Sequence, residues 1–413
     1  MTRIFKFLTS SIIAFRNAPR AARVGSFLFF VASVADGTLM PFFPLWARND
    51  AGIPVEYIGL LLGCYASGEL LATPFVGGIA DRVGRRPVLL ASTAGMGVGF
   101  IFLYFAPGVI AAALSLLVIG LFESVLHPTA ATAITDVVAQ EERRGHFAMT
   151  RVMANAGRII GPALGGILAL WSLRLVFLGA AVTILIGAVV VAALLPETWD
   201  GRTHGDGDDD DESLTALGAA IHDRRLAGLL VSISVLEIAV SWIEAVTPLY
   251  ATAAGALTPT GIGMLFAYAG VIGVIFQLPV TQASQRISGF ATVLWSGAIE
   301  ALAFVFLLPT PALPLLIAAI TLASFARMLS SPLVQAIVSE LAPRNAQATY
   351  QAAFSVVFDM KDAVGPAVGT WLYAISTTLP WGTGIVASIG ASFALAVAAR
   401  RHEARQTNKG ETG

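Results

Sequence analysis

The run RLVFLGAAVTILIGAVVVAALL, from residue 174 to residue 195, decides the fold. Its single charge is at its first residue, and every other position is apolar or small. A helix needs roughly 20 apolar residues to cross a bilayer core of about 30 Å, so this run is long enough to span a membrane. A β-barrel would show short alternating segments instead of such a continuous run.

Twelve runs of this kind follow one another along the chain. Hydrophobic residues make up 56% of the sequence and charged residues 12%, whereas a soluble domain carries roughly 25% charged residues. The sequence therefore predicts an all-α membrane protein with twelve transmembrane helices. The expected spans are 25–46, 57–77, 87–106, 109–138, 147–171, 174–195, 226–252, 259–284, 289–309, 312–338, 347–374 and 380–400.

Composition also limits the partners. The net charge is −1 and no basic cluster with interleaved aromatic residues is present, so we expect no nucleic-acid partner. The single cysteine, Cys64, lies inside an apolar run, which excludes an internal disulfide and a thiolate metal site. We expect no cofactor and no metal. The expected partners are a small-molecule substrate, protons and the lipid bilayer, with a monomer as the functional unit.

Basic residues predict the orientation, because cytoplasmic loops carry an excess of lysine and arginine. The odd connections hold almost none beyond Arg48 and Arg174. The even connections and the C-terminal tail hold Arg82, Arg85, Arg86, Arg143, Arg144, Arg202, Arg224, Arg225, Arg286, Arg344, Arg400, Arg401, Arg405 and Lys409. Both termini are therefore expected in the cytoplasm, with the chain in the cell (inner) membrane. Residues 1–24 show no cleaved signal and form either a basic surface helix or a mobile tail.

An acidic stretch divides the chain. Residues 206–212 read DGDDDDE, and like charges at this density repel one another and stay solvated. A calcium site would need a glycine-spaced ligand loop, which this stretch lacks. The expected organisation is a tail (1–24), a six-helix bundle (25–195), an acidic cytoplasmic linker (196–225), a second six-helix bundle (226–400) and a cytoplasmic tail (401–413).

The two halves repeat one pattern. Gly161 and Pro162 recur 204 residues later as Gly365 and Pro366. The other anchors are Pro44 with Pro248 and Glu123–Pro128 with Arg327–Pro332 at the same offset, and Pro74 with Pro279 at an offset of 205. Internal duplication with a site between the repeats is typical of secondary transporters. The fold class expected is thus two pseudo-symmetric six-helix bundles.

The connection after the second span carries a known motif. Residues 77–86 read GGIADRVGRR, which resembles the loop motif G-x-L-A-D-R-x-G-R-R of the major facilitator superfamily, with Ile79 in place of leucine. The resemblance covers residues 25–400, and its second copy, QASQRISG at 282–289, is degenerate. It implies the twelve-helix fold of that family and a secondary transporter.

The resemblance further implies that this loop latches the two halves on the cytoplasmic side. Glycines allow close approach and a tight turn, and Asp81 is expected near a helix start, where the dipole favours an anion. Asp136, at the foot of the fourth span, is the expected partner of the arginines. The alternative is that the arginines only set the topology. The gating set is Gly77, Asp81, Arg82, Gly84, Arg85, Arg86 and Asp136.

The fifth span resembles the G-x-x-x-G-P-x-x-G-G signature of proton-coupled antiporters, the drug exporters in particular. The matching residues are Gly157, Gly161, Pro162, Gly165 and Gly166. An earlier glycine of the signature is Ala148 here, so the match is partial. Small residues at these spacings also let helices pack closely in lipid, which is the alternative explanation.

Charges inside the membrane indicate the site, because each costs about 2.5–3.5 kcal/mol at mid-bilayer on insertion scales. The resemblance places the first, fourth, seventh and tenth spans around a central cavity. These spans carry Asp36, Glu123, His127, Glu237, Glu244 and Arg327. Burial favours the protonated form of a carboxyl group, so Asp36 is the first candidate for proton coupling; a static hydrogen-bonded acid is the alternative.

Three of these residues have alternative roles. Glu123 and Arg327 occupy equivalent positions in the halves and form a salt bridge in one state, or else Arg327 holds an anionic group of the substrate. His127 relays protons or is a hydrogen-bond partner of Glu123.

A third set of charges is assigned to the interface between the bundles, and a pair of Glu69 with Lys361 is expected there. Arg158 and Asp362 are equivalents in the two halves, so structural balance explains both. The set comprises Glu69, Arg158, Asp359, Lys361 and Asp362.

The sequence thus predicts a secondary active transporter that works by alternating access, a proton-coupled exporter of small amphipathic or drug-like compounds. An importer or facilitator of a small metabolite is the alternative on the same fold. A membrane enzyme is the alternative of another class; the H-E-x-x-H and G-x-S-x-G motifs are both missing from the sequence.

Overall fold

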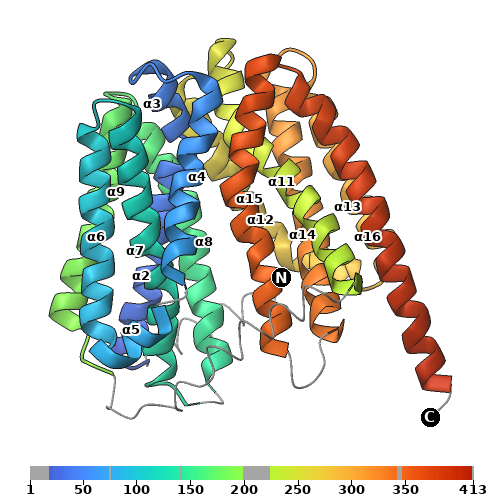
Figure 1. Ribbon diagram of the computed structural model, residues 1–413, viewed down its shortest axis with the longest axis horizontal. Helices are drawn as coiled ribbons and strands as arrows, with labels where there is room; N and C mark the ends of the chain where they lie inside the picture. Colours follow the sequence, from blue (N-terminus) through green and yellow to red (C-terminus); the bar gives the residue numbers. More distant parts are fainter. Residues whose placement is uncertain (1–17, 74–75, 140–141, 199–223, 342–346, 412–413) are drawn as a thin grey trace. The chain divides into compact units, whose positions relative to one another are not determined.

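The computed structural model describes residues 18–73, 76–139, 142–198, 224–341 and 347–411, which form α-helices joined by short connections (Figure 1). They form two compact units. The first is drawn from residues 1–53, 61–204 and 258–270, and the second from residues 54–60, 205–257 and 271–413. Residues 55–60 begin the helix Val55–Ala72 and are grouped with the second unit, whereas the rest of that helix belongs to the first. Residues 259–270 are the first half of the helix Pro259–Ser284 and are grouped with the first unit, whereas its remainder belongs to the second.

The first unit is built around α2 (Arg20–Leu39), which packs against α7, α8 and α9. Proline explains where α2 ends, because Pro41 cannot donate a backbone hydrogen bond within a helix; the chain turns there and continues as α3 (Phe43–Asn49). The other helices are α4 (Val55–Ala72), α5 (Val76–Val83), α6 (Arg85–Phe105), α7 (Val109–Thr135), α8 (Arg143–Leu168) and α9 (Leu173–Leu194).

The second unit has α11 packed against α15 and α16, and α13 packed against α14 and α16. Its apolar core includes Ile233, Val293, Val334 and Leu395, contributed by four different helices. The helices are α11 (Arg224–Ala253), α12 (Pro259–Ser284), α13 (Gly289–Leu307), α14 (Leu313–Leu341), α15 (Gln347–Ile375) and α16 (Leu379–Glu411).

Ten helical stretches among the described residues are long and apolar enough to cross a membrane, with α2 and α3 counted as one. The two remaining expected spans, 147–171 and 347–374, are occupied by α8 and α15, of 26 and 29 residues. At 1.5 Å per residue even α8 is about 39 Å long, enough to cross. Each carries several charged residues, which lower its hydropathy: α8 has Arg143, Arg144, Arg151 and Arg158, and α15 has Asp359, Lys361 and Asp362.

Three local expectations change. The motif loop contains a short helix, α5, and Asp81 lies in its last turn, not near a helix start as expected. The fourth helix ends at Thr135, before the expected limit of 138. The last helix continues to Glu411, so helical backbone extends through most of the segment expected as a tail.

Candidate functional site

In the first unit, side chains from three helices meet at one partly buried cluster. Asp36 from α2 and Glu123 and His127 from α7 each bring a ligand atom within 4.8 Å of the others. The Tyr65 hydroxyl, from α4, donates a hydrogen bond to Oε2 of Glu123. The Nε2 atom of His127 lies 3.8 Å from Oε1 of Glu123. The structure therefore brings together the three first-unit residues that the sequence assigned to the cavity.

The cluster contains polar atoms that are buried without a partner. Oδ1 of Asp36 and Nδ1 of His127 have no hydrogen-bond partner among the described residues. Glu123 and Tyr65 are each only 4% exposed. A buried polar atom without a partner carries a free-energy cost of about 1–3 kcal/mol, so such an atom calls for a functional explanation.

Backbone packing sets the position of Asp36. A Cβ atom added at Gly161 of α8 would lie 2.6 Å from the carbonyl oxygen of Val34, and one added at Gly157 would lie 2.6 Å from that of Phe30. A Cβ atom added at Gly37, the residue after Asp36, would lie 2.7 Å from the Pro162 ring. The antiporter-like glycines thus bring α8 into backbone contact with the helix that carries Asp36.

The last two glycines of that motif also lie in close contacts. A Cβ atom at Gly165 would lie 2.5 Å from the Phe42 ring. The carbonyl oxygen of Gly166 accepts a hydrogen bond of 2.8 Å from the Thr260 hydroxyl. Every glycine of the motif therefore has a packing role, whatever further role it has in transport.

Two charges assigned to the bundle interface also belong to the first unit. Arg158 on α8 is exposed and lies close enough to act electrostatically on Asp36. Glu69 on α4 is half-buried and acts in the same way on Tyr65. Both charges therefore influence the Asp36 cluster.

In the second unit, charges form a separate network. Nη1 of Arg327 lies 2.5 Å from Oε1 of Glu244. Lys361 lies 3.1 Å from Oδ1 of Asp362 and 4.0 Å from Oε2 of Glu244. The partner of Arg327 within its unit is thus Glu244, which the sequence did not pair with it. The Asp359 side chain lies outside the part that the structure describes.

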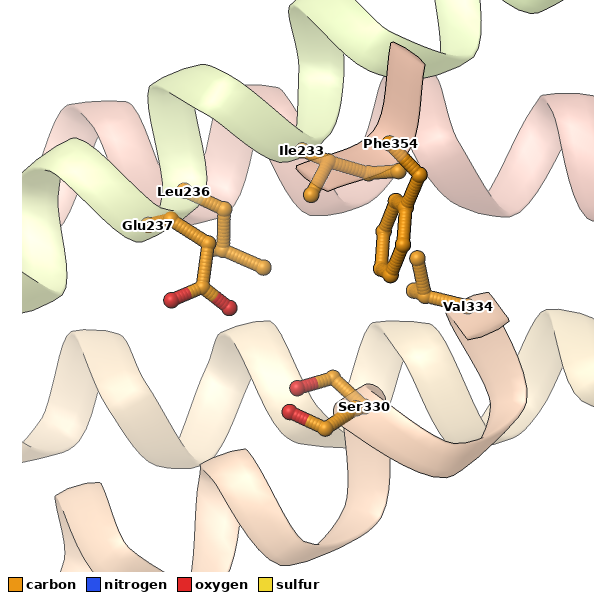
Figure 2. A pocket seen from close by; sticks show the side chains of 7 residues that line it. Ile233, Leu236, Glu237, Ser330, Val334 and Phe354 are labelled. Atoms are coloured by element: carbon orange, nitrogen blue, oxygen red, sulfur yellow. The ribbon is translucent and has the colours of Figure 1, made fainter. Parts of the chain in front are cut away.

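Glu237 lies at a small cavity between α11, α14 and α15 (Figure 2). Its carboxyl group is directed toward Ser330, and apolar side chains line the other side. The lining residues are Ile233, Leu236, Glu237, Ser330, Ser331, Val334 and Phe354. Glu237 is 7% exposed, and the charges of Lys361 and Arg327 act on it electrostatically.

The motif loop forms an ion-pair network around Arg85, which is 7% exposed. Its Nη1 atom lies 2.6 Å from Oδ1 of Asp81, and its Nε atom lies 3.3 Å from Oδ2 of Asp136. Nη1 also donates to the carbonyl oxygen of Ala80 at 2.6 Å. The expected partnership of Asp136 with an arginine of this loop is present.

Glycine is required at one point of this loop. Gly84 has φ of 100°, in the region that favours glycine, and it separates α5 from α6. Gly77 lies within α5, and Arg82, in its last turn, is exposed. Arg86 is exposed as well and donates to the carbonyl oxygen of Ala192 at 2.8 Å.

Sequence reasoning missed Glu197, which accepts from the first two amides of α6. The amide of Arg85 donates to Oε1 at 2.9 Å and that of Arg86 to Oε2 at 3.2 Å. An anion at this position satisfies free amides and interacts favourably with the helix dipole. The sequence places Glu197 in the linker; the structure makes it a side chain of the motif network, and no local pattern signals this.

Two further residues were missed. Tyr65 gave no sequence signal, because an aromatic residue in an apolar span is ordinary. Glu300 on α13 did give one: it is a carboxyl inside a span, 1% exposed, and the hydroxyl of Ser388 donates to it at 3.0 Å. The resemblance places the first, fourth, seventh and tenth spans at the cavity, and Glu300 lies on the ninth.

The Asp36 cluster also has the composition of a metal site, since two carboxylates and an imidazole are ligands for divalent cations. However, Tyr65 already engages one Glu123 oxygen. Two acids this close compete for a proton, because both cannot ionise without repulsion. No cofactor is needed for that chemistry.

These features define a class of protein: a helical membrane protein of two repeats with buried charges in each, which is the class of secondary transporters. The family model described as Major Facilitator Superfamily matches residues 25–359 and, in a second match, 245–413. The chain belongs to the major facilitator superfamily, and the expected fold of twelve transmembrane helices in two six-helix bundles is confirmed.

Named relatives agree with this assignment. The tetracycline resistance protein of class C from Escherichia coli is 25% identical over 370 residues, 88% of this chain and 91% of that protein. The class G protein from Vibrio anguillarum is 28% identical over 362 residues, 86% of this chain and 90% of that protein. The quinolone resistance protein NorA from Staphylococcus aureus is 21% identical over 252 residues, 61% of this chain and 64% of that protein.

Solved structures share the fold. A variant of the nucleoside transporter NupG superposes with a TM-score of 0.75 at 13% identity, covering 92% of this chain and 99% of that one. A variant of the peptide transporter POT gives a TM-score of 0.74 at 15% identity, covering 93% and 95%. At these identities the likeness concerns the fold alone.

Proposed function

We propose that this protein is a proton-coupled exporter of small amphipathic or drug-like compounds, working by alternating access, and that Asp36 takes up the coupled proton. The observation that carries the proposal is the buried cluster in which an oxygen of Asp36 lacks a partner beside Glu123 and His127. An acid held in this way gains from binding a proton, and the proton then changes the charge that a cationic or polar substrate meets. The relatives named for tetracycline and quinolone resistance support export as the direction.

The remaining assignments follow the same proposal. The network of Arg85, Asp81 and Asp136 serves as a cytoplasmic gate. Arg85 is largely buried and ion-paired, so the gate can open only when these contacts break. The charges of the second unit, Arg327 and Glu244 among them, contribute to substrate recognition. The two six-helix bundles of residues 25–195 and 226–400, joined by the acidic linker, are the moving parts. The chain acts as a monomeric carrier in the inner membrane, without cofactor or enzymatic activity, and both termini face the cytoplasm.

The test uses everted membrane vesicles that contain the full chain. Candidate substrates are first identified in a growth screen with tetracyclines and quinolones, the compounds that appear in the names of the relatives. An imposed proton gradient should drive accumulation of the exported compound, and a protonophore should abolish it. The Asp36→Asn variant should lose this gradient-driven accumulation while it reaches the membrane in normal amounts.

Asp50→Asn is the matched control, because Asp50 is an exposed aspartate just after α3. It should leave accumulation unchanged. Accumulation that ignores the gradient, or an Asp36→Asn variant as active as the control, contradicts the proposal. Gradient-driven movement out of everted vesicles indicates the alternative, an importer.

A further inference from the structure

We infer that Tyr65 is a positioning residue for proton coupling: its hydroxyl keeps Glu123 ionised, so that the transported proton binds Asp36. The inference rests on the proposed function and adds a residue that the sequence pattern did not reveal. The geometry behind it is the hydrogen bond from the Tyr65 hydroxyl to Oε2 of Glu123, between two side chains that are each 4% exposed.

The tyrosine is held in place by its backbone. A Cβ atom added at Gly120 of α7 would lie 2.0 Å from the carbonyl oxygen of Tyr65, and one at Gly68 of α4 would lie 2.2 Å from that of Leu117. The two helices therefore touch along their backbones at Tyr65 itself and one turn further along α4. A tyrosine has few rotatable bonds, so its hydroxyl has little freedom to leave Glu123.

The groups around Glu123 indicate what the Tyr65 hydroxyl does. The charged and titratable groups that act on this cluster are Asp36 from α2, Tyr65 and Glu69 from α4, Arg158 from α8, and His127 from α7 itself. Two acids within 4.8 Å compete for one proton, because both cannot ionise without repulsion. A donor fixed on one of them decides which acid is ionised, since a hydrogen bond to the charged form favours that form.

The proton step is then simple. With Glu123 ionised, a proton from the outer solution binds an oxygen of Asp36, where Oδ1 has no other partner. On the cytoplasmic side the O–H bond of Asp36 breaks and the proton goes to water. Tyr65 and Glu123 keep their protonation states throughout. Substrate and proton therefore compete through the charge of Asp36 alone.

The variant that tests this inference is Tyr65→Phe, which removes one oxygen atom and retains the ring. The readout is the pH profile of gradient-driven accumulation in everted vesicles. Without the donor, Glu123 also takes up a proton, and the midpoint of the profile should move to higher pH by about one to two units, the shift that corresponds to one hydrogen bond to a charged group. This midpoint belongs to the acid pair as a whole.

Two further variants make the result specific. Tyr57→Phe is the control, since Tyr57 lies on the same helix and is 49% exposed; its profile should match the wild type. Glu123→Gln should retain gradient-driven transport, with the midpoint at lower pH because Asp36 loses a like-charged neighbour. In that background, Tyr65→Phe should cause no further shift, because its effect is transmitted through Glu123.

A Tyr65→Phe profile that coincides with the wild type overturns the inference, and so does a full shift in the Glu123→Gln background. Loss of proton drive in Glu123→Gln overturns it as well, and this variant decides the matter even where Tyr65→Phe fails to reach the membrane. A wild-type protein without proton drive counts against the proposed function itself, which distinguishes the two failures.

Discussion

Replacing Gly161 by alanine tests the close packing of α2 against α8. The added Cβ atom would lie 2.6 Å from the carbonyl oxygen of Val34 and 2.9 Å from Cα of Gly37, whereas ordinary contacts begin at 3.4 Å. The helices would have to separate by about 0.8 Å, the difference between 3.4 Å and 2.6 Å. Both neighbours are backbone atoms, so neither can rotate away.

The expected cost follows from overpacking, which destabilises by about 1–3 kcal/mol. For a unit of about 200 residues this corresponds to an unfolding midpoint lower by about 2–12 °C. The midpoint is measured by heating the purified protein in detergent and recording the loss of its monodisperse peak in size-exclusion chromatography. Transport should fall as well, because a shift of α2 moves Asp36 away from Glu123.

Gly390→Ala is the control, since Gly390 is also inside a helix, α16, and a Cβ atom there meets nothing within 4 Å. The unfolding midpoint of Gly390→Ala should be higher than that of the wild type or unchanged, because alanine is more favourable than glycine inside a helix by about 1 kcal/mol. A Gly161→Ala protein as stable and active as this control refutes the close-packing argument.

The other predictions concern polar contacts. Glu197→Ala should lower stability by about 0.5–2 kcal/mol, as for loss of a helix cap, and Glu197→Gln by less; unfolding midpoints compare the two. Ser388→Ala removes the hydroxyl that donates to the buried Glu300 and should cost about 1–3 kcal/mol, measured in the same way, whereas an unchanged midpoint means that another group satisfies Glu300. Arg327→Glu and Glu244→Arg should each abolish transport, and the double exchange should recover part of it in the vesicle assay; no recovery would show that the charges act separately.

The sequence predicted the fold class well, because it depends on a feature that needs no tertiary information. Apolar runs long enough to span a bilayer, and a duplication with a constant offset, are visible in one dimension. The motif loop was also predictable, and the pairing of Asp136 with Arg85 is present. The position of Asp81 was wrong, because the short helix α5 ends, rather than begins, near it.

The candidate site was predictable in part, for a physical reason. Asp36, Glu123 and His127 stand out because charged or titratable groups in lipid are costly, and this cost is readable from the sequence. Their grouping in one cluster agrees with the assignment. Whether they couple transport to protons stays a prediction.

Neighbours that act through packing or hydrogen bonds are not visible in this way. Tyr65 looks like any aromatic residue of a span, and only the contact of α4 with α7 brings its hydroxyl to Glu123. The repeat makes Arg327 and Glu123 equivalent, but it does not reveal that Arg327 pairs with Glu244 within its own unit; the pairing of Arg327 with Glu123 stays a prediction. Sequence symmetry gives equivalent positions; it does not give distances.

The engagement of Glu197 and Thr198 determines where the polypeptide can be divided. Thr198 donates from its hydroxyl to Oδ2 of Asp136 at 3.1 Å, next to the bonds from Glu197 to the start of α6. Both residues therefore bind to the amino-terminal half of the chain and belong to it structurally. If the protein is co-expressed as two fragments, the chain should be divided after residue 198. A break before Glu197 would leave this residue on the carboxy-terminal fragment, whereas the start of α6, which Glu197 caps, lies on the amino-terminal fragment.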